Sequence, residues 1–318
     1  MKRVIILFPR LDVMFKEGPV PDHRGPVAPI RLHWARFVEL LYHHHDTKHD
    51  SVEVIEKPLW QFTRAFVESL DADIIYIPHK SVDTFPLVSS AEIRYYMQTV
   101  FPFMFYVDSK GFAGGSSRYP FDIEYTHKTR FYEEMIDRAR RGESKFDQPA
   151  PLNIYKLPQN FVFFPCQIPH DETIRYHSDV TVLQALIAVL EATKKLNISC
   201  VIKGHPVNPR SMDDLIFASR DYNHAQWIDN ISIHEVMPKS RAVACVNSGT
   251  GMEALLHKVP VITFGRCEYD CVTNKATPST IETVLTNATF SEEKTKAFFE
   301  TWYNWCIDTR KIESYSRL

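Results

Sequence analysis

The chain has 318 residues, of which 44% are hydrophobic and 13% aromatic, enough for two domains with large buried cores. Its formal net charge of -2 gives no global basic field, which argues against nucleic acid as a partner. No stretch approaches the roughly 18 apolar residues of a membrane span, so we expect no stable transmembrane insertion. The first apolar run, residues 4–8, is also too short for a secretory signal.

The six cysteines fit neither a zinc site nor a disulfide framework. Only Cys267 and Cys271 are close, with three residues between them and no second pair to match. We therefore expect reduced thiols in a cytoplasmic protein. Peripheral association with the inner face of a membrane stays open, because an acceptor on a lipid carrier would require proximity to it.

Strand-like apolar runs alternate with helical patterns along the first half of the chain. A Pro/Gly-rich loop at 17–29 separates the first strand from the first helix. The pattern predicts strands at 4–8, 52–55, 74–77 and 103–107, and helices at 30–43, 63–70, 91–99 and 127–141.

Residues 142–160 hold Gly142 and three prolines, a composition that predicts a linker. The alternation then resumes. It predicts strands at 161–164, 199–202, 225–228, 242–246 and 260–264, and helices at 179–196, 211–219, 233–239, 251–257 and 291–308.

Such alternation predicts an α/β protein with parallel sheets and crossover connections. We expect two Rossmann-like domains facing a cleft, at 1–148 and 149–290, with a C-terminal segment, 291–318, that crosses back to the first domain. Ligands of open parallel sheets bind beyond the C-terminal ends of the strands. The polar residues that follow strands are therefore the candidates for a site.

Lys203-Gly-His205-Pro206 ends one predicted strand with a cation and a histidine. Lys203 offers a positive charge to a phosphate, and either ring nitrogen of His205 can donate a hydrogen bond. Pro206 bends the chain away from the strand and so holds the imidazole at its end. The alternative is an ordinary strand exit with a surface lysine.

Asn247-Ser248-Gly249-Thr250-Gly251 ends another strand and begins a helix. Glycine lets the backbone approach a ligand, and the hydroxyls of Ser248 and Thr250 can donate to phosphate. The helix N-terminus adds free N–H groups. Glu253 can form a capping box with Thr250, and capping alone is the alternative to phosphate binding.

Gln167-Ile-Pro-His-Asp171 follows the first strand of the second half. A carboxylate that faces the cleft can act as a nucleophile or a general base. Asp171 can equally be a helix N-cap, a role for which Thr173 and Ser178 compete.

The first domain offers further candidates for substrate contacts. His79 and Lys80 end a strand on the cleft side, and the segment that ends at Gln98 lies further on. The loop 111–119 either lines an acceptor-sugar site or is a mobile surface loop.

Two patterns resemble metal sites, but we expect neither to bind metal. His43-His44-His45 with His49 lies at a predicted helix end, where a solvated helix terminus is the better interpretation. Asp71-Ala-Asp73 precedes a strand, at the wrong end for a site.

Several of these motifs resemble those of the bacterial capsule-polysaccharide transferases, and in particular the retaining β-Kdo transferases. The motifs concerned are Gln167-x-x-x-Asp171, Lys203-x-His205-Pro206, Asn247-Ser248-Gly249, Glu253-Ala-Leu with Lys258-Val-Pro-Val261, Tyr95-Tyr96-Met97-Gln98 and Gly111-Phe-Ala-Gly. The resemblance implies a GT-B-like fold, with an acceptor-side first domain and a donor-binding second domain.

The resemblance also implies a chemistry. Asp171 would be the catalytic carboxylate and His205 would act on the departing phosphate of a CMP-activated donor. The resemblance implies no metal and no other cofactor. A second carboxylate in the first domain stays open between Glu92 and Glu124. The residues that would hold the CMP are Lys203, His205, Asn247, Ser248, Gly249, Thr250 and Glu253, and those that would contact the substrate are Gln167, His79, Lys80 and Gln98.

We therefore expect a glycosyltransferase that moves Kdo, or a related acidic sugar, from CMP to a glycan acceptor in surface-polysaccharide synthesis. The acceptor is free or lipid-linked. A transferase for a UDP- or GDP-linked sugar is one alternative, and a catalytically silent nucleotide- or glycan-binding module is another.

Overall fold

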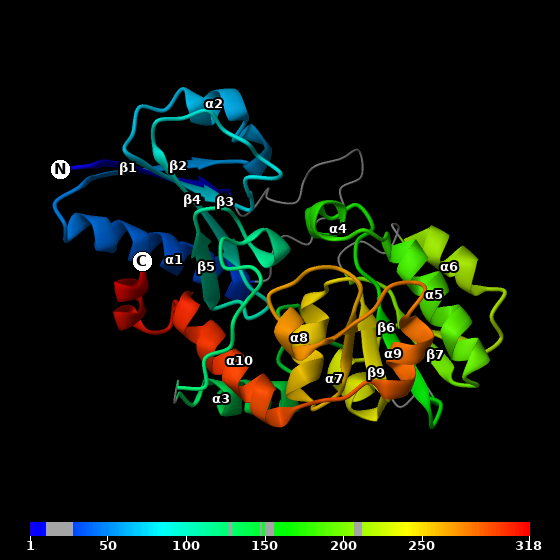
Figure 1. Cartoon of the computed structure of the whole chain (residues 1–318). Coiled ribbons are helices and arrows are strands. Elements are labelled where there is room, and N and C mark those ends of the chain that lie inside the picture. Colours follow the sequence, from blue (N-terminus) through cyan, green and yellow to red (C-terminus); the bar gives the residue numbers. More distant parts are fainter. Residues whose placement is uncertain (11–27, 127–128, 147, 150–155, 207–211) are drawn as a thin grey trace. The chain divides into compact units, whose positions relative to one another are not determined.

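The computed structural model describes residues 1–10, 28–126, 129–146, 148–149, 156–206 and 212–318. The loop predicted at 17–29 and the centre of the predicted linker lie largely outside these ranges. The chain forms two compact units, Met1–Tyr119 with Trp302–Leu318, and Pro120–Thr301 (Figure 1). The expected domain boundary at residue 148 thus falls within the second unit. The expected division into acceptor and donor domains stays a prediction.

The first unit is built on a six-stranded mixed sheet of order β12-β5-β4-β3-β1-β2. The strands from β2 to β4 are parallel, whereas β5 is antiparallel to both β4 and β12. The elements of this unit are β1 (Arg3–Pro9), α1 (Ala28–Asp46), β2 (Ser51–Lys57), α2 (Arg64–Glu68), β3 (Ile74–Pro78), β4 (Glu92–Gln98), β5 (Met104–Asp108) and β12 (Cys306–Asp308).

The predicted helix at 91–99 is wrong, because these residues form β4. Tyr95 belongs to the apolar cluster that includes Val67 of α2. Tyr96 contacts Trp34 of α1, with ring centroids 5.6 Å apart. Neighbouring residues that point to opposite layers follow the two-residue period of a strand. In so short a segment, the apolar pattern does not separate this period from a helical one.

The tail forms one helix and then a strand. Helix α10 (Glu292–Trp305) ends three residues before the predicted end at 308. Cys306–Asp308 instead pair antiparallel with β5 as β12. The helix ends there because pairing with β5 gives Cys306–Asp308 backbone hydrogen bonds in place of helical ones.

The second unit holds a six-stranded parallel sheet of order β11-β10-β9-β6-β7-β8. Chain order reverses between β6 and β9, which is the topological switch point where doubly wound sheets bind ligands. The elements are α3 (Phe131–Arg140), β6 (Phe161–Pro165), α4 (Glu172–His177), α5 (Val182–Lys195), β7 (Ser199–Lys203), α6 (Asp213–Ser219), β8 (Ala225–Ile228), α7 (Ile233–Val236), β9 (Ala242–Cys245), α8 (Gly249–Leu256), β10 (Val261–Thr263), β11 (Asn274–Lys275), α9 (Ile281–Asn287) and most of α10.

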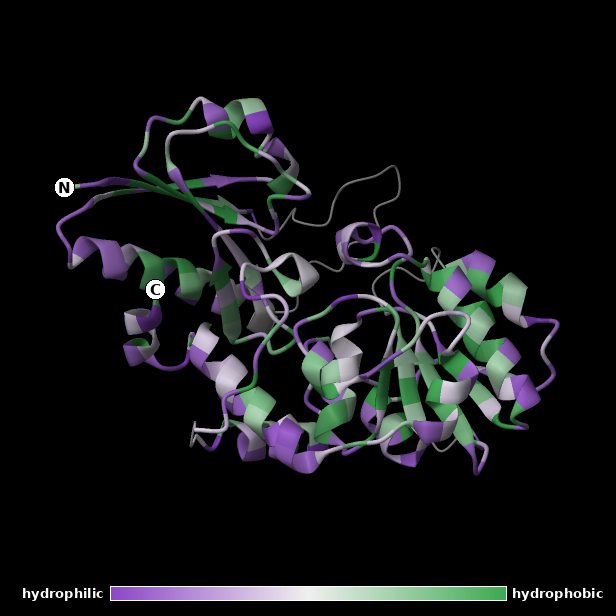
Figure 2. Cartoon of the chain, in the orientation of Figure 1, coloured by the Kyte–Doolittle hydropathy of each residue, from purple (hydrophilic) through white to green (hydrophobic). Residues whose placement is uncertain are grey.

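Helices cover both faces of this second sheet (Figure 1). Val162 and Phe164 of β6 share an apolar cluster with Leu186 of α5 and Leu285 of α9. Helix α8 packs on β9 and β10. The strands of this sheet are largely hydrophobic, shown in green in Figure 2. A strand buried on both faces reads as a continuous apolar run, which is why these strands were predicted well.

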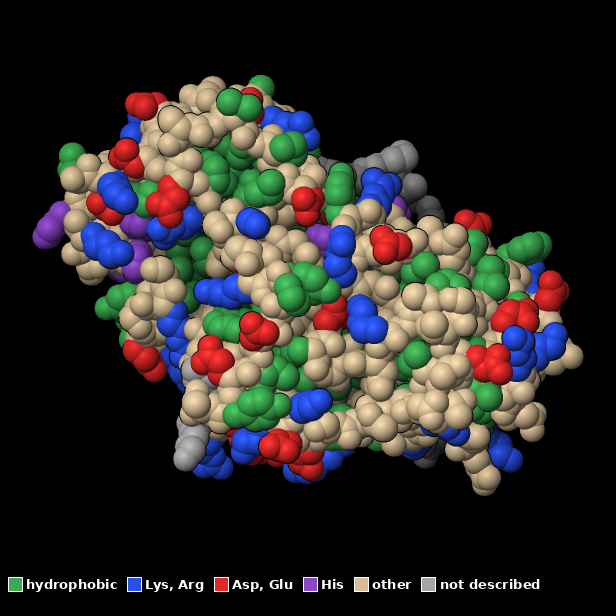
Figure 3. Space-filling view, viewed as in Figure 1, with side chains coloured by type: hydrophobic (Ala, Val, Ile, Leu, Met, Phe, Trp, Pro, Cys, Tyr) green, Lys and Arg blue, Asp and Glu red, His purple; other side chains and the backbone are tan. Residues whose placement is uncertain are grey.

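The surface mixes both signs of charge. On the face seen in Figure 3, basic and acidic side chains are interspersed, as the small net charge predicts. Among the helices of the described ranges, none combines the length and the apolar character needed to cross a membrane.

Candidate functional site at the switch point of the second sheet

Gln167 and Asn247 tie the loop after β6 to the loop after β9. The Gln167 Oε1 accepts from the backbone N–H groups of Val246 and Asn247, at 3.1 and 3.0 Å. Its Nε2 donates to Asn247 Oδ1 at 2.9 Å. The Asn247 Nδ2 in turn donates to the carbonyls of Thr173 and Arg266. Both amides therefore fix the loops at the switch point, and their expected contacts with ligand stay predictions.

Asp171 is the N-cap of α4. Its Oδ1 accepts from the backbone N–H of Thr173 at 2.8 Å and from the Thr173 hydroxyl at 2.7 Å. The cap orients the exposed carboxylate at the C-terminal edge of β6. A carboxylate has two oxygens and about four lone-pair directions, so capping and chemistry are compatible.

Lys203 and His205 follow β7, the neighbour of β6. Cys166 donates its N–H to the Lys203 carbonyl at 2.8 Å, which places the two strand ends side by side. Burial lowers the pKa of His205 to about 4, opposed by the negative charge of Asp171. Burial also lowers the pKa of Lys203, opposed by Asp229. At pH 7, His205 is therefore a neutral hydrogen-bonding group.

Ser248, not Thr250, is the N-cap of α8. Its Oγ accepts from the Thr250 N–H at 3.2 Å, and its carbonyl accepts from the hydroxyl of Tyr269. The predicted capping box between Thr250 and Glu253 is therefore wrong, because Glu253 lies two residues beyond the N3 position of this cap. The Gly251 N–H donates to the Ser248 carbonyl at 2.9 Å, so the N–H groups of both Thr250 and Gly251 are bonded to the cap residue. What this terminus offers an anion is therefore the positive end of the helix dipole and the N–H at the first helical position, Gly249.

Glu253 lies in a buried polar cluster that the motifs did not predict. Its Oε1 accepts from the Ser144 hydroxyl, and the His234 Nε2 lies 3.8 Å from it. The His234 Nδ1 is 2.9 Å from the His257 Nε2. Burial raises the pKa of Glu253 to about 7 and lowers those of both histidines to about 4. Ser144 was missed because it lies in the predicted linker.

The first-unit candidates lie close to α1 and β3. The ring of His79 stacks on Trp34, with centroids 5.0 Å apart. The Gln98 Oε1 accepts from the Trp34 Nε1 at 3.2 Å, while its Nε2 donates to the Pro102 carbonyl at 2.6 Å. The Lys80 ammonium lies 5.9 Å from the ring centroid of Phe85. Gln98 thus has a clear structural role, and substrate contact by all three stays a prediction.

A single buried carboxylate, Asp108, organises the start of the loop 111–119. It accepts hydrogen bonds from the N–H groups of Lys110, Gly111 and Ser117 and from the hydroxyls of Ser116 and Ser117. The loop is thereby held to the end of β5. Its expected part in an acceptor site stays a prediction.

The histidines at the end of α1 are not all solvated. His44 and His45 are buried, so the interpretation as a solvated helix end is wrong for these two. The His45 ring nitrogens lie 3.0 Å from the Asp50 carboxylate and 3.0 Å from the Tyr76 hydroxyl. In the part of the chain that the structure describes, no three His, Cys, Asp or Glu side chains are grouped to hold a metal ion.

The remaining acidic candidates have structural partners. Asp71 and Asp73 bind the side chain and the backbone N–H of Arg3, before β3. Glu92 forms an ion pair with Arg94 at 2.6 Å. Glu124, considered as a second carboxylate of the first domain, lies in the second unit.

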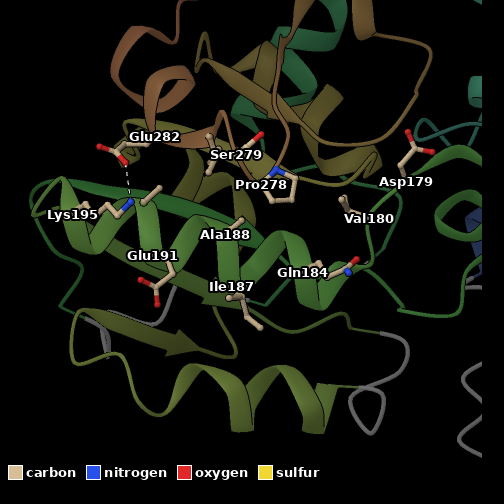
Figure 4. A pocket seen from close by; sticks show the side chains of 12 residues that line it. Asp179, Val180, Gln184, Ile187, Ala188, Glu191, Lys195, Pro278, Ser279 and Glu282 are labelled. Carbon is tan, nitrogen blue, oxygen red and sulfur yellow. Dashed lines mark hydrogen bonds and ion pairs between the residues drawn. The ribbon is translucent and has the colours of Figure 1, made fainter.

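A groove of about 510 Å³ lies elsewhere on the second unit, between α5 and the start of α9 (Figure 4). The Lys195 ammonium and the Glu282 carboxylate bridge it at 3.2 Å. None of the expected site residues is among the residues that line it, so the groove is separate from the switch-point site.

The sequence model of the family described as capsule polysaccharide biosynthesis protein matches residues 86–298. The chain belongs to this family. The match includes every second-unit residue of the candidate site.

One capsule protein of known name is similar in sequence to this chain. The chain is 22% identical over 200 residues to the capsule polysaccharide modification protein LipB of Neisseria meningitidis serogroup A / serotype 4A, a match that covers 58% of this chain and 45% of that protein. The chain thus spans about half the length of this relative.

A solved structure, the β-Kdo 2,7 transferase KpsC of Thermosulfurimonas dismutans, is similar in fold. The TM-score is 0.56 at 16% identity, over 93% of this chain and 89% of that one. With the two sheets described above, this similarity confirms the predicted α/β class with two Rossmann-like units of the GT-B type.

Proposed function

We propose that this capsule-family protein is a glycosyltransferase that moves Kdo, or a related acidic sugar, from CMP to a glycan acceptor. The observation that carries the proposal is the juxtaposition of Asp171 and neutral His205 at the C-terminal ends of β6 and β7, beside the switch point. Family membership and the fold shared with a β-Kdo transferase support the reaction class.

In this mechanism the Asp171 carboxylate attacks the anomeric carbon. The bond from that carbon to the phosphate oxygen breaks, and CMP leaves with the electron pair. An acceptor hydroxyl then displaces Asp171, releases its proton to solvent and restores the original anomeric configuration. Because His205 is neutral, it stabilises the departing phosphate by donating a hydrogen bond, worth about 2–4 kcal/mol in a preorganised site.

The α8 N-terminus and Lys203 complete the proposed phosphate site. Ser248 caps α8, and the N–H groups that follow it carry the positive end of the helix dipole. Lys203 supplies a positive charge at the end of β7, which lies on the other side of β6 from β9. In this scheme the charge of Lys203 and the dipole of α8 would balance the phosphate, so the scheme calls for no metal.

The identity of the donor nucleotide is tested by thermal unfolding in the presence of CMP, UDP, GDP or ADP. A ligand that binds only the folded state raises the midpoint temperature of unfolding. We expect a shift with CMP alone. If UDP or GDP alone raises the unfolding temperature, the donor is a sugar linked to that nucleotide and not to CMP. Binding of CMP without release of CMP from CMP-Kdo, in the presence of acceptor glycans, would favour a silent binding module.

Asp171 can be tested apart from its capping role. Asn is also a good N-cap, so we expect Asp171→Asn to keep stability within a few tenths of a kcal/mol, whereas Asp171→Ala costs about 1 kcal/mol. Both should lose transfer by at least about a hundredfold and still bind CMP. Transfer near the wild-type rate in Asp171→Asn would remove Asp171 from the mechanism.

A further inference from the structure

The segment Ser144–Phe146 contacts two elements of the candidate site, although its composition predicted a linker. The Ser144 hydroxyl donates to the Oε1 of Glu253 on α8. The ring of Phe146 lies edge-on to that of His205 after β7, with centroids 6.0 Å apart. The segment is therefore fixed on both sides of Lys145.

A further hydrogen bond holds the chain just beyond this segment, at Gln148. The side-chain oxygen of Gln148 accepts from the backbone N–H of Ile233, at the start of α7, at 3.1 Å. Three successive contacts, to α8, to the β7 loop and to α7, all lie within the second unit. They hold this stretch against the sheet edge that carries the motifs.

Lys145 interacts electrostatically with the carboxylates of both Asp171 and Glu253. Burial lowers the pKa of Lys145 to about 8, and the two carboxylates oppose that shift. The ammonium is thus mainly charged at pH 7, on a side chain that is half-buried. There a charge acts on a nearby anion more strongly than it would on the open surface.

We propose that Lys145 is a further binding residue of the donor site, where its ammonium binds an anionic oxygen group of the nucleotide sugar beside Asp171. This inference rests on the proposed function. A donor with a phosphate and an acidic sugar brings negative charge toward the Asp171 carboxylate, and a cation between them offsets the repulsion. The anionic group is either the phosphate or the carboxylate of the sugar.

Lys145→Met tests the proposal by calorimetric titration with CMP. We expect the dissociation constant to rise about tenfold or more, the range for a lost hydrogen bond to a charged group. Lys145→Arg should keep most of the affinity. Lys239→Met is the matched control, because exposed Lys239 lies just before β9, at the opposite edge of the same sheet.

The pattern of losses identifies the bound group. Weaker CMP binding in Lys145→Met assigns the phosphate. Unchanged CMP binding with a raised KM for CMP-Kdo assigns the sugar carboxylate. If both are unchanged in a folded Lys145→Met, Lys145 only neutralises Asp171 and Glu253, and the proposal is overturned. If the wild type binds no CMP, the proposed function fails first, and this inference fails with it.

A pH series keeps the test decisive if Lys145→Met does not fold. As pH rises through about 8, Lys145 loses its charge, whereas arginine stays protonated and the CMP phosphate stays a dianion. Wild-type affinity for CMP or CMP-Kdo should therefore fall more steeply than that of Lys145→Arg, and equal slopes would overturn the proposal. The charged and titratable groups around this site are the same in both proteins: Arg138, Asp171, Lys203, His205 and Glu253.

Discussion

Glu253 is a carboxylic acid that the fold buries beside a hydroxyl and a histidine. Only 5% of its surface is exposed, and burial raises its pKa from 4.5 to about 7. The folded protein therefore keeps the proton up to about pH 7, while the unfolded chain releases it above about pH 4.5. The contribution of Glu253 to stability is present below pH 4.5 and is lost as pH rises through 7.

Glu253→Gln should remove this pH dependence, because glutamine keeps the oxygen that accepts from Ser144. We expect the variant to match the wild type near pH 4 and to exceed it at pH 8 by about 3 kcal/mol, from a shift of about 2.5 pKa units. Urea unfolding at both pH values measures the difference. Exposed Glu293→Gln is the control, and an equal effect at both pH values would contradict the prediction.

Individual side chains also show which hydrogen-bond partners the motifs did not predict. Asp171 is a helix N-cap, the alternative that the sequence left open for it, whereas the cap of α8 is Ser248 and not Thr250. Gln167 was expected to contact substrate, but its oxygen binds two backbone N–H groups after β9. Nothing in the local sequence gives these partners, because Gln167 and Asn247 are 80 residues apart.

At the scale of elements, the start of α8 depends on close contact with Tyr269. A Cβ on Gly251 would lie 2.5 Å from the Tyr269 hydroxyl and 3.0 Å from two of its ring carbons. The same hydroxyl donates to the Ser248 carbonyl. Glycine at 251 therefore lets the loop after β10 hold the helix N-terminus that we propose as the phosphate site.

Gly251→Ala should destabilise the protein by about 1–3 kcal/mol, the usual cost of overpacking a well-packed site. Tyr269→Phe removes the nearest clashing atom, so the double variant should lose less than the sum of the two single changes. A double-mutant cycle from urea unfolding measures this coupling. Additive losses would show that the two residues do not meet in solution.

At the scale of the whole molecule, the chain leaves the second unit and ends in the first. Strand β12 pairs with β5, and the Arg310 guanidinium lies 3.5 Å from the ring centroid of Phe103. The Asp308 carboxylate binds the same guanidinium at 2.7 Å. The last residues thus complete the sheet of the unit that begins the chain.

Deletion of residues 306–318 should weaken the first unit selectively, because it exposes the edge of β5. We expect faster amide hydrogen exchange in β4, β5 and α1, while β6 and β7 keep their protection. Exchange measured by mass spectrometry resolves the two units in one sample, so the second unit is the internal control. A uniform increase across both sheets would contradict the prediction.

The sequence by itself determined the α/β class, nearly all strands of the parallel sheet and the positions of the motifs after β6, β7 and β9. These features are local, since a buried parallel strand is a short apolar run and its C-terminal end is marked by polar residues and turn formers. Tertiary structure decided the rest: β4 in place of a helix, the antiparallel pairing of β5 and β12, the bonds between Gln167 and the loop after β9, and the position of Lys145 near Asp171 and Glu253. Each depends on pairing or burial between segments far apart in the chain, and no local pattern encodes such a contact.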